Sequence, residues 1–368
     1  MKKTTQLLRV LLAGILAVAM LLTSAGSALA LESQGRTVCA PSDQTLYKVT
    51  PTETISSVTD NIKTFSYKGD DGLNCFYQNG GASSVNSTLL FLGKNIVKFR
   101  SAPDPKLYDA CSTIHTQGPN GHWYFGRNFD YSPCNMIIVK NEPTGGYKNI
   151  TSVDMDFVTE KLGSAAKLIP DDVIKKIALW IPLDGMNEKG VAISINMIQD
   201  DAIIDQKVAG KTDQICVTAV RTILDRAASV DEALKILAGS NFHTWEGFMV
   251  HLAISDPSGK HVAVEWLNDQ MYINDTPIMT NFYITPGEKH GIGTHQSVIR
   301  FGTLTDTLAK NPNLSATEVR DALASVAKSN FPDDNHTTEW SIVFDQNDLT
   351  ATYYRQENYK VGYIFSVK

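Results

Sequence analysis

Apolar and polar positions alternate over much of this chain, and helical spacing replaces the alternation in two places. Short apolar runs bounded by Gly, Asn, Asp and Ser are typical of strands. They predict strands at residues 111–116, 123–125, 136–140, 191–196, 248–254, 261–266, 271–273, 338–344 and 351–355. This order of strand hairpins, a helical block and further strands predicts an α+β layered domain.

Helical spacing covers residues 212–238, where apolar side chains fall on one helix face. Within this block, Ser229 and Glu232 have the spacing of a capping box, so a second helix is expected to begin there. Residues 315–328 predict an amphipathic helix that begins with Ser315 as its cap. Because helices do not alternate singly with strands, a doubly wound parallel sheet is not expected.

The beginning of the chain has the pattern of a secretory signal peptide. Lysines and an arginine lie in residues 2–9, an apolar core covers residues 10–22, and the small residues 28–30 form a cleavage site. The apolar core is shorter than the roughly 20 residues that span a bilayer, which disfavours the alternative of a membrane anchor. We therefore expect residues 1–30 to be a signal peptide and the protein to be secreted or periplasmic, with no stable membrane span.

Composition and charge are those of an ordinary globular protein. Hydrophobic residues make up 43%, charged residues 20%, and the net charge is −6. A negative balance disfavours nucleic acid as a partner, because binding to phosphates needs a basic surface. The length allows either two domains or one large one.

Five cysteines, an odd number, leave one thiol over if the others pair in an oxidising compartment. They are Cys39, Cys75, Cys111, Cys134 and Cys216. If Cys111 is the reactive thiol, the other four allow three pairings or none. No Cys-x-x-Cys or His-Glu-x-x-His spacing occurs, so no metal site is expected.

Cys111 begins the first strand of a predicted hairpin whose turn is the Gly-Pro-Asn-Gly at residues 118–121. Arg127 and Asp130 follow the second strand, so they are expected to fold back towards Cys111. A neighbouring guanidinium favours the thiolate, which is the nucleophilic form of cysteine. The alternative is a buried structural cysteine near an Arg–Asp surface pair.

Residues 31–110 are interpreted as a prosegment of 80 residues that blocks the site until it is removed or cleaved. Short β-like runs at 89–92 and 95–99 alternate with Gly-rich and Asp-rich turns, and two prolines in residues 101–105 break regular structure before Cys111. The alternative is a small, permanent N-terminal subdomain.

Five motifs in order resemble the choloylglycine hydrolase family, which includes bile-salt hydrolases and penicillin V acylases and is related to acid ceramidase and N-acylethanolamine acid amidase. The family has a nucleophilic cysteine, an arginine 16 positions later and an aspartate 19 positions later, as in Cys111, Arg127 and Asp130. The motifs are Cys-Ser-Thr-Ile at 111–114, Gly-Arg-Asn-Phe-Asp-Tyr at 126–131, Asp-Gly-Met-Asn-Glu at 184–188, Thr-Asn at 280–281 and Ser-Val-Ile-Arg-Phe at 297–301.

The resemblance implies an N-terminal nucleophile hydrolase domain over residues 111–368, a four-layer αββα sandwich with two antiparallel sheets. It implies cleavage between Ala110 and Cys111, after which the α-amine of Cys111 serves as the base. The implied site residues are Cys111 as nucleophile, Arg127 and Arg300 near the thiolate, Asp130 on the amine, and the Asn196 N–H and Asn281 side chain as oxyanion donors.

The implied function is that of an exported hydrolase that cleaves a non-peptide linear amide through an acyl-enzyme on Cys111. Its partner would be a small-molecule amide such as a conjugated bile acid, penicillin V or a fatty-acyl amide, with no cofactor. Bile-salt hydrolases usually continue the Thr-Asn motif with Ser-Pro, whereas this chain has Phe282 and Tyr283, so bile-salt specificity is not implied. Oligomeric state stays open, although tetramers are frequent in the family.

Two other functions remain as alternatives to the amide hydrolase. One is a papain-like hydrolase that pairs a cysteine with one of the eight histidines. The other is a non-catalytic exported protein that binds lipids or bile acids on a hydrolase fold. The second alternative predicts an uncut chain that forms no acyl-enzyme.

Overall fold

The computed structural model describes residues 43–93, 110–159, 169–198, 200, 202–244, 249–287, 293–331 and 336–368. The expected signal peptide (residues 1–30), Cys39, the β-like run at 95–99 and the proline-containing stretch at 101–105 lie outside these residues.

The first sheet has seven strands in the order β1-β18-β17-β16-β5-β4-β15. Its strands are β1 (Thr45–Val49), β4 (Ala110–Gln117), β5 (Trp123–Tyr131), β15 (Ile278–Met279), β16 (Thr337–Asp345), β17 (Thr350–Arg355) and β18 (Val361–Ser366). The predicted hairpin is confirmed, because β4 and β5 pair antiparallel around the Gly-Pro-Asn-Gly turn. This hairpin lies near one edge of the sheet, with only β15 beyond β4.

The second sheet has nine strands in the order β14-β13-β12-β9-β8-β7-β6-β3-β2. Its strands are β2 (Ser56–Thr59), β3 (Ile62–Gly69), β6 (Met136–Pro143), β7 (Asn149–Asp154), β8 (Asp184–Asn187), β9 (Ala192–Ile198), β12 (Met249–Ser255), β13 (His261–Leu267) and β14 (Gln270–Asn274). A separate short parallel pair joins β10 (Thr212–Gln214) to β11 (Ser240–Phe242).

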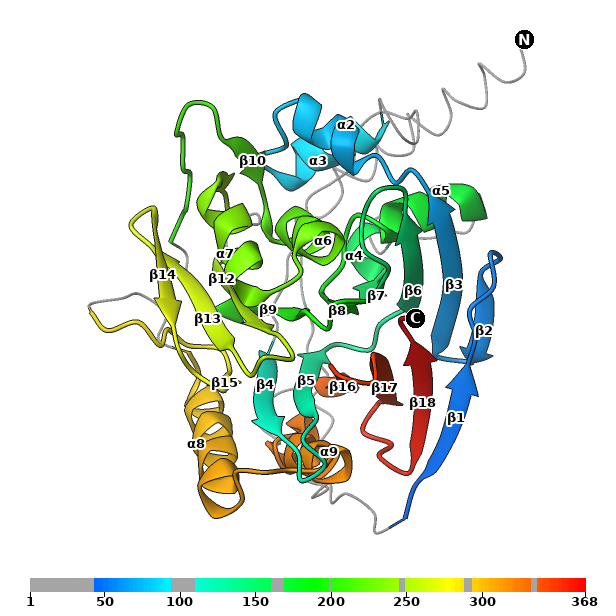
Figure 1. Cartoon of the computed structure of the whole chain (residues 1–368), viewed down its shortest axis with the longest axis vertical. Helices are drawn as coiled ribbons and strands as arrows, with labels where there is room; N and C mark the ends of the chain where they lie inside the picture. The colour runs from blue at the N-terminus through cyan, green and yellow to red at the C-terminus, as the bar shows by residue number, and fades with distance from the viewer. Residues whose placement is uncertain are drawn as a thin grey trace, which may run out of the picture.

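Helices cover the outer faces of both sheets, which gives the predicted four-layer αββα arrangement (Figure 1). On the seven-stranded sheet, α8 and α9 lie over β4, β5 and β16, and on the nine-stranded sheet α6 and α7 lie over β8, β9 and β12. The helices are α2 (Leu73–Gln78), α3 (Val85–Phe91), α4 (Asp156–Thr159), α5 (Asp171–Ala178), α6 (Cys216–Arg226), α7 (Val230–Ala238), α8 (His295–Lys310) and α9 (Ala316–Ser325), with a 3₁₀ turn η3 (Lys328–Asn330).

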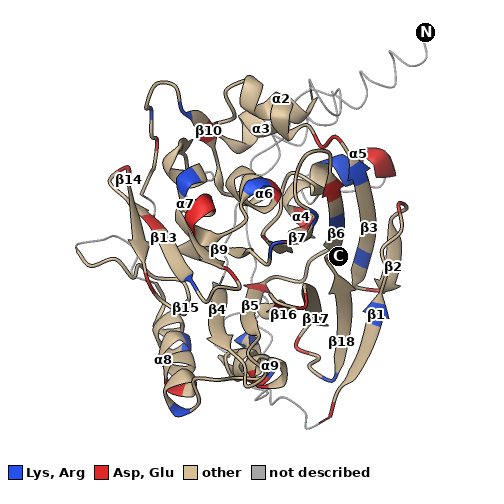
Figure 2. Ribbon diagram, in the orientation of Figure 1, with Lys and Arg blue, Asp and Glu red and all other residues tan. Residues whose placement is uncertain are grey.

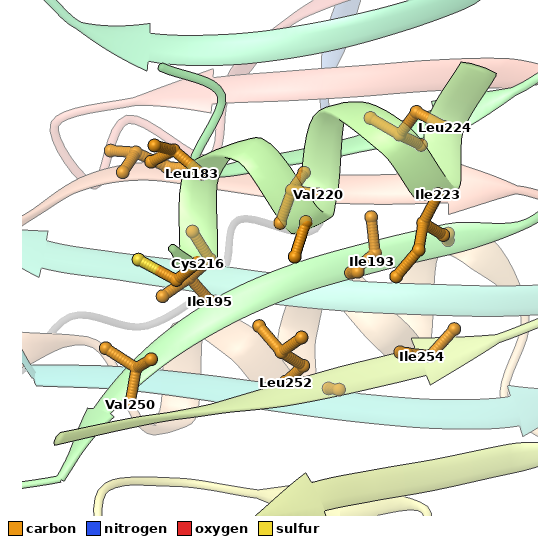
Figure 3. Packing of buried hydrophobic residues seen from close by; sticks show 14 of the residues in the cluster. Leu183, Ile193, Ile195, Cys216, Val220, Ile223, Leu224, Val250, Leu252 and Ile254 are labelled. Carbon is orange, nitrogen blue, oxygen red and sulfur yellow. The ribbon is translucent and has the colours of Figure 1, made fainter. Parts of the chain in front are cut away.

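The predicted helical block consists of α6 and α7, and α6 packs on the outer face of the nine-stranded sheet. Val220 and Ile223 of α6 face Ile193 of β9 and Leu252 of β12 (Figure 3). All four side chains are fully buried, so the apolar spacing of this helix is explained by one contiguous contact with the sheet.

Helix starts follow the predicted capping residues. Ser229 accepts a hydrogen bond from the Glu232 N–H at the start of α7. Ser315 and Glu318 form a complete capping box at the start of α9. At α7 the Glu232 carboxylate accepts from the Ala228 N–H, so only the Ser229 half of the predicted box forms. Each cap satisfies N–H groups that have no partner inside the helix.

Residues 45–93 belong to the same layers as the rest of the chain. Strand β1 pairs in parallel with β18 at the edge of one sheet, and β3 pairs in parallel with β6 in the other. Ile62 and Phe65 of β3 are fully buried. Both sheets are otherwise antiparallel in their named pairs, so the part of the chain before Cys111 supplies the parallel pair of each sheet.

A buried ion pair also joins this N-terminal segment to the helical layer. The Arg221 guanidinium of α6 contacts the carboxylates of Asp71 and Asp225. The Asp71 carbonyl accepts a hydrogen bond of 2.9 Å from the Trp180 indole N–H. Removing one partner of a buried ion pair leaves an uncompensated charge, so these contacts tie residue 71 firmly to the later chain.

Two predicted elements differ from the structure. The helical block expected from residue 212 begins only at Cys216, because residues 212–214 form strand β10. The run at residues 89–92 was expected to be β-like, but its first residues form the end of α3. Ser84 and Ser87 cap this helix reciprocally. The periodicity of a short apolar run does not distinguish a strand from a helix. Here the reciprocal cap of Ser84 and Ser87 favours the helix.

Charged residues of both signs share the same helices rather than separating into patches. Figure 2 shows both colours on α5 and on α7. On α5, Asp171 and Asp172 lie in the first turn and Lys175 and Lys176 in the last, which complements the helix dipole. Within the part of the chain that the structure describes, no helix is long and apolar enough to cross a membrane.

Substitution of a core residue in the N-terminal segment should destabilise the whole domain. Phe65→Ala is expected to lower the free energy of unfolding by about 3–5 kcal/mol, because Phe65 is fully buried in the nine-stranded sheet. Urea unfolding followed by tryptophan fluorescence measures this loss in a single transition. Lys63→Ala, at an exposed position of the same strand, is the control. A separate early transition with an unchanged main midpoint would contradict integration of the segment.

Candidate active site

Cys111 lies on β4, opposite Phe129 of β5, and its side chain is fully buried. Alternate residues of a strand point to opposite faces. Cys111, Arg127 and Phe129 therefore share the face towards the second sheet, whereas Ser112 and Asp130 share the face towards α8 and α9. Arg127 and Asp130 were expected to follow the second strand but lie within it, so the ladder itself fixes their distance from Cys111.

On the face towards the second sheet, the Arg127 guanidinium lies against the Cys111 side chain. Its Nη2 is 3.7 Å from Cys111 Sγ and donates to the Ile195 carbonyl at 2.9 Å. The guanidinium also lies over the Phe129 ring, 5.1 Å from its centroid. A fixed positive charge at this distance favours the thiolate of Cys111 over the thiol.

Asp184, at the start of β8, holds Arg127 in this place. Its carboxylate pairs with Arg127 Nη1 and accepts a 3.0 Å hydrogen bond from the Trp340 indole N–H. Burial raises the pKa of Asp184, and the Arg127 guanidinium opposes that rise. The Asp-Gly-Met-Asn motif therefore brings a carboxylate to the site in addition to its turn.

On the other face of β4, Arg300 of α8 binds the backbone of Cys111. Arg300 Nη1 donates to the Cys111 carbonyl and to Ser112 Oγ, each at 2.6 Å. Its Nη2 donates to Asn281 Oδ1 at 2.8 Å. Arg300 was expected near the sulfur, but these bonds make it an anchor of the Cys111 main chain.

Asp130 lies beside Arg300 and next to the predicted cleavage site. It pairs in register with Ala110, and its Oδ1 accepts a 2.6 Å hydrogen bond from Thr338 Oγ1. Its Oδ2 lies 3.7 Å from Arg300 Nη1 and makes no hydrogen bond within the described part of the chain. Complete burial raises the pKa of Asp130 to about 6, against the opposing effect of Arg300.

Asn281 contacts the backbone nitrogen of Cys111 directly. The Cys111 N–H donates to Asn281 Oδ1 at 2.7 Å, and Asn281 Nδ2 donates to the Met197 carbonyl at 2.8 Å. Two donors on one atom, Cys111 N–H and Arg300, identify that atom as the amide oxygen. Only one of the two Nδ2 protons is used by Met197.

Asn196 lies behind Asn281. Its Nδ2 donates to the Thr280 carbonyl at 3.2 Å, and its Oδ1 accepts from Ser194 Oγ at 2.9 Å. In a trans peptide the carbonyl and the next N–H point in opposite directions. The Ile195 N–H bonds to the Leu183 carbonyl beside β8, and the next N–H of the strand points to the opposite edge, so the Asn196 N–H faces β12. This is not the position expected of an oxyanion donor.

Four side chains of this site were not identified as site residues from the sequence: Asp184, Ser297, Thr338 and Trp340. The Ser297 hydroxyl accepts from the Asn281 N–H at 2.9 Å. Ser297 lies in the Ser-Val-Ile-Arg-Phe motif, so this motif could have identified it as a site residue. Thr338 and Trp340 lie more than 200 residues beyond Cys111, and no local pattern marks them.

Two buried histidines that the papain-like alternative could use, His115 and His243, have partners other than Cys111. His115 bonds to Gln346 and His261, at 2.9 and 3.2 Å, and burial lowers the pKa of His115 to about 3. His243 bonds to two aspartates.

No disulfide joins any two of the four described cysteines.

One group of the described residues has ligand atoms within 4.8 Å of one another, as a metal site requires: His122, Asp345 and Asp348. His122 already pairs with Asp345 at 3.0 Å, and this bond raises the pKa of His122. The group lies at the far end of the β4–β5 hairpin from Cys111 and is no part of the site.

Comparison with known families gives one match. Residues 179–360 match the family model of acyl-coenzyme A:6-aminopenicillanic acid acyl-transferase. This segment contains Asp184, Asn196, Asn281, Arg300 and Trp340 but not Cys111. A search among curated proteins found no match.

Similar solved structures include two mutant forms of the conjugated bile acid hydrolase from Clostridium perfringens. They are 20% and 17% identical, with TM-scores of 0.49 and 0.48, and each match covers 67% of this chain and 90% of the other. Penicillin V acylase from Agrobacterium tumefaciens is 17% identical with a TM-score of 0.47, covering 67% and 83%. These TM-scores lie below 0.5, so the fold described above stands on its own topology.

The titration of Asp130 should appear in the stability of the uncut chain. A carboxyl whose pKa is higher in the folded state contributes stability that is complete below its unfolded value, about 3.9, and lost as pH rises through about 6. In a Cys111→Ala background, Asp130→Asn should therefore gain stability relative to its parent between pH 4 and pH 7, by up to about 3 kcal/mol.

Urea unfolding of both chains at several pH values measures this difference. Asp306→Asn, on the outer part of α8 where the side chain is exposed, is the control and should show no such trend. A constant difference between Asp130→Asn and its parent across the range would mean that Asp130 has an ordinary pKa.

Proposed function

Residues 179–360 belong to the acyl-coenzyme A:6-aminopenicillanic acid acyl-transferase family, and from this premise we propose that the chain is a cysteine N-terminal nucleophile hydrolase of non-peptide linear amides. One observation carries the proposal: the backbone N–H of Cys111 is held by Asn281 Oδ1 while a guanidinium lies 3.7 Å from its sulfur. A structural cysteine needs neither contact. The nucleophile requires both, because its nitrogen becomes the catalytic base.

In maturation, the Cys111 sulfur attacks the Ala110 carbonyl carbon and the Ala110–Cys111 C–N bond breaks. The nitrogen of Cys111 takes a proton, and a thioester joins Ala110 to the sulfur. Water hydrolyses this thioester to a carboxylate on Ala110 and a thiol on Cys111. Arg300, bound to the Cys111 carbonyl, and Asn281 keep the new N-terminus in place.

The segment before the cut would then stay bound as part of the mature protein. Strands β1 and β3 pair along β18 and β6, and the Asp71–Arg221 ion pair is buried. We therefore assign residues 31–110 to a prosegment that is cleaved, with residues 45–93 retained in the fold. In the alternative of a permanent N-terminal subdomain, the segment is equally part of the fold, but the Ala110–Cys111 bond is not cleaved.

In turnover, the α-amine of Cys111 accepts the thiol proton, since a free α-amine has a pKa of about 7.7–8.0. The sulfur attacks the substrate amide, the amine leaves with a proton, and water releases the acid from the acyl-enzyme. Arg127 favours the thiolate. Asp130 Oδ2, without a hydrogen bond in the described uncut chain, binds the ammonium form. The second Nδ2 proton of Asn281 stabilises the oxyanion.

The substrate is proposed as a small N-acyl amide. The relatives are named for 6-aminopenicillanic acid, penicillin V and conjugated bile acids. Penicillin V and conjugated bile acids carry an acyl group on a non-peptide amide nitrogen, and 6-aminopenicillanic acid is an amine that an acyl-transferase would acylate. Phe282 lies directly after Asn281 and packs edge-on against Phe301, at 5.2 Å between ring centroids. An aromatic pair next to the site favours a penicillin V or fatty-acyl amide over a polar acyl group.

Export through a signal peptide at residues 1–30, to a secreted or periplasmic location, is part of the same proposal. It rests on the sequence pattern alone. A second possible reaction is acyl transfer to an added amine, which the name of the matching family specifies. Product analysis with an amine present separates transfer from hydrolysis.

Cys111→Ala should abolish both cleavage and activity, because it removes the nucleophile of both steps. Intact mass and N-terminal sequence of the purified protein measure cleavage: the parent should yield a chain that begins with Cys111, and the variant should not. Cys216→Ala, a buried cysteine at the start of α6, is the control and should be cut normally. A parent chain that begins near residue 31, does not change on incubation and resists thiol-directed acyl probes would support the binding-protein alternative.

Asn281→Ala should lower kcat by about 100- to 1,000-fold on a penicillin V or fatty-acyl amide substrate, the usual loss of one oxyanion donor. It should also slow self-cleavage, because the Cys111 nitrogen loses its acceptor. Rates of product release and of chain cleavage measure the two effects. Asn241→Ala removes an equally buried carboxamide bonded to Val208 and Asp213 and should leave both rates within about threefold. Equal losses in the two variants would assign Asn281 to folding alone.

A further inference from the structure

A buried imidazole–carboxylate pair lies behind the active site, outside the residues assigned so far. His251 on β12 and Glu265 on β13 are both fully buried. His251 Nδ1 is 3.1 Å from Glu265 Oε1. Fully buried ionisable side chains are rare unless they are paired, so the His251–Glu265 pair is a specific feature of the nine-stranded sheet.

The second ring nitrogen of His251 faces the chain that carries Asn281. Nε2 lies 2.9 Å from the Thr280 carbonyl oxygen. Asn196, the register partner of His251 on β9, donates to the same oxygen at 3.2 Å. Two side chains of adjacent strands therefore hold one carbonyl, and that carbonyl belongs to the peptide bond preceding Asn281.

Both partners of His251 are hydrogen-bond acceptors. A carbonyl oxygen cannot donate. Each Glu265 oxygen already accepts a main-chain N–H, Oε1 from Ile284 and Oε2 from Thr285, which is the pattern of a carboxylate. Burial acts to raise the pKa of Glu265, but these bonds, together with the hydrogen bond and the charge of His251, lower it to about 2. To make both bonds, His251 must donate from both nitrogens. The ring is then an imidazolium whose counter-ion is Glu265.

Glu265 also fixes the chain on the other side of Asn281. Its Oε1 accepts from the Ile284 N–H at 2.7 Å and its Oε2 from the Thr285 N–H at 2.8 Å. On the near side, the Asn281 N–H is held by Ser297 Oγ at 2.9 Å. The peptide bond between Thr280 and Asn281 is thus held at both its carbonyl and its N–H. Glu265 holds the chain again three residues after Asn281.

We propose that His251, held by Glu265, is a positioning residue that orients Asn281 towards the nitrogen of Cys111. The proposal rests on the function proposed above in taking Asn281 as an active-site residue. It goes beyond that function by assigning the geometry of Asn281 to a doubly donating histidine. Small displacements of a catalytic group are costly, about 100-fold in rate for 1 Å.

The first test does not depend on activity. In the uncut Cys111→Ala chain labelled with ¹⁵N-histidine, long-range ¹H–¹⁵N correlation spectra at neutral pH should show both His251 nitrogens protonated. The resonance is assigned by its loss in His251→Gln. Glu265→Gln should convert it to a neutral ring. A single protonated nitrogen on His251 in the parent would overturn the proposal, whether or not the chain proves to be an amidase.

The second test separates positioning from folding. His251→Gln should lower kcat by about 10- to 100-fold on the same amide substrate with KM within about threefold, and should shift the Asn281 side-chain amide resonance. His243→Gln is the matched control, because His243 is also a buried histidine paired with acidic residues, Asp205 and Asp213. An equal loss of kcat in both variants, or an unmoved Asn281 resonance, would overturn the assignment. Absence of amidase activity in the parent would reject the proposed function alone.

Discussion

The Arg300 guanidinium is the contact on which the arrangement around Cys111 depends. From α8 it reaches the Cys111 carbonyl, Ser112 Oγ and Asn281 Oδ1, and it lies 3.7 Å from Asp130 Oδ2. These groups come from three separate stretches of the chain besides its own helix. A fully buried cation needs such partners, because isolated burial of a charge is prohibitive. The need to satisfy one guanidinium therefore also brings the nucleophile, an amide and a carboxylate together.

Charge is divided between the two faces of one strand. Arg127 with Asp184 lies on the face of β4 and β5 that carries the Cys111 side chain, and Arg300 with Asp130 lies on the opposite face. The Cys111 sulfur therefore faces the Arg127–Asp184 ion pair, and the Cys111 main chain faces the Arg300–Asp130 pair. This division explains how a single residue can have its thiol activated and its nitrogen held by separate groups.

Local chemistry explains how much could be predicted from the sequence. The hairpin at Cys111 and the helix starts at Ser229 and Ser315 follow from turn and cap residues a few positions apart. The spacing of the family motifs predicted six site residues, of which Arg127, Asn281 and Arg300 contact Cys111 directly. The rest depends on distant partners. Thr338 reaches Asp130 across 208 positions, and β1 gains its place only by pairing with the last strand. No local sequence pattern marks either contact. For the same reason, the sequence did not predict that residues 45–93 join the two sheets.

The pairing of β1 with β18 has a consequence for the timing of synthesis. Thr45 pairs with Val361, 316 positions later (361 − 45), and the groups that hold the Cys111 main chain come from residues 170 and 189 positions beyond it. A chain still growing on the ribosome lacks these partners. Self-cleavage that requires them must wait until translation is almost finished. Under the proposed self-cleavage, products truncated before these residues would remain uncut, so the order of synthesis would confine the cut to chains that are nearly complete.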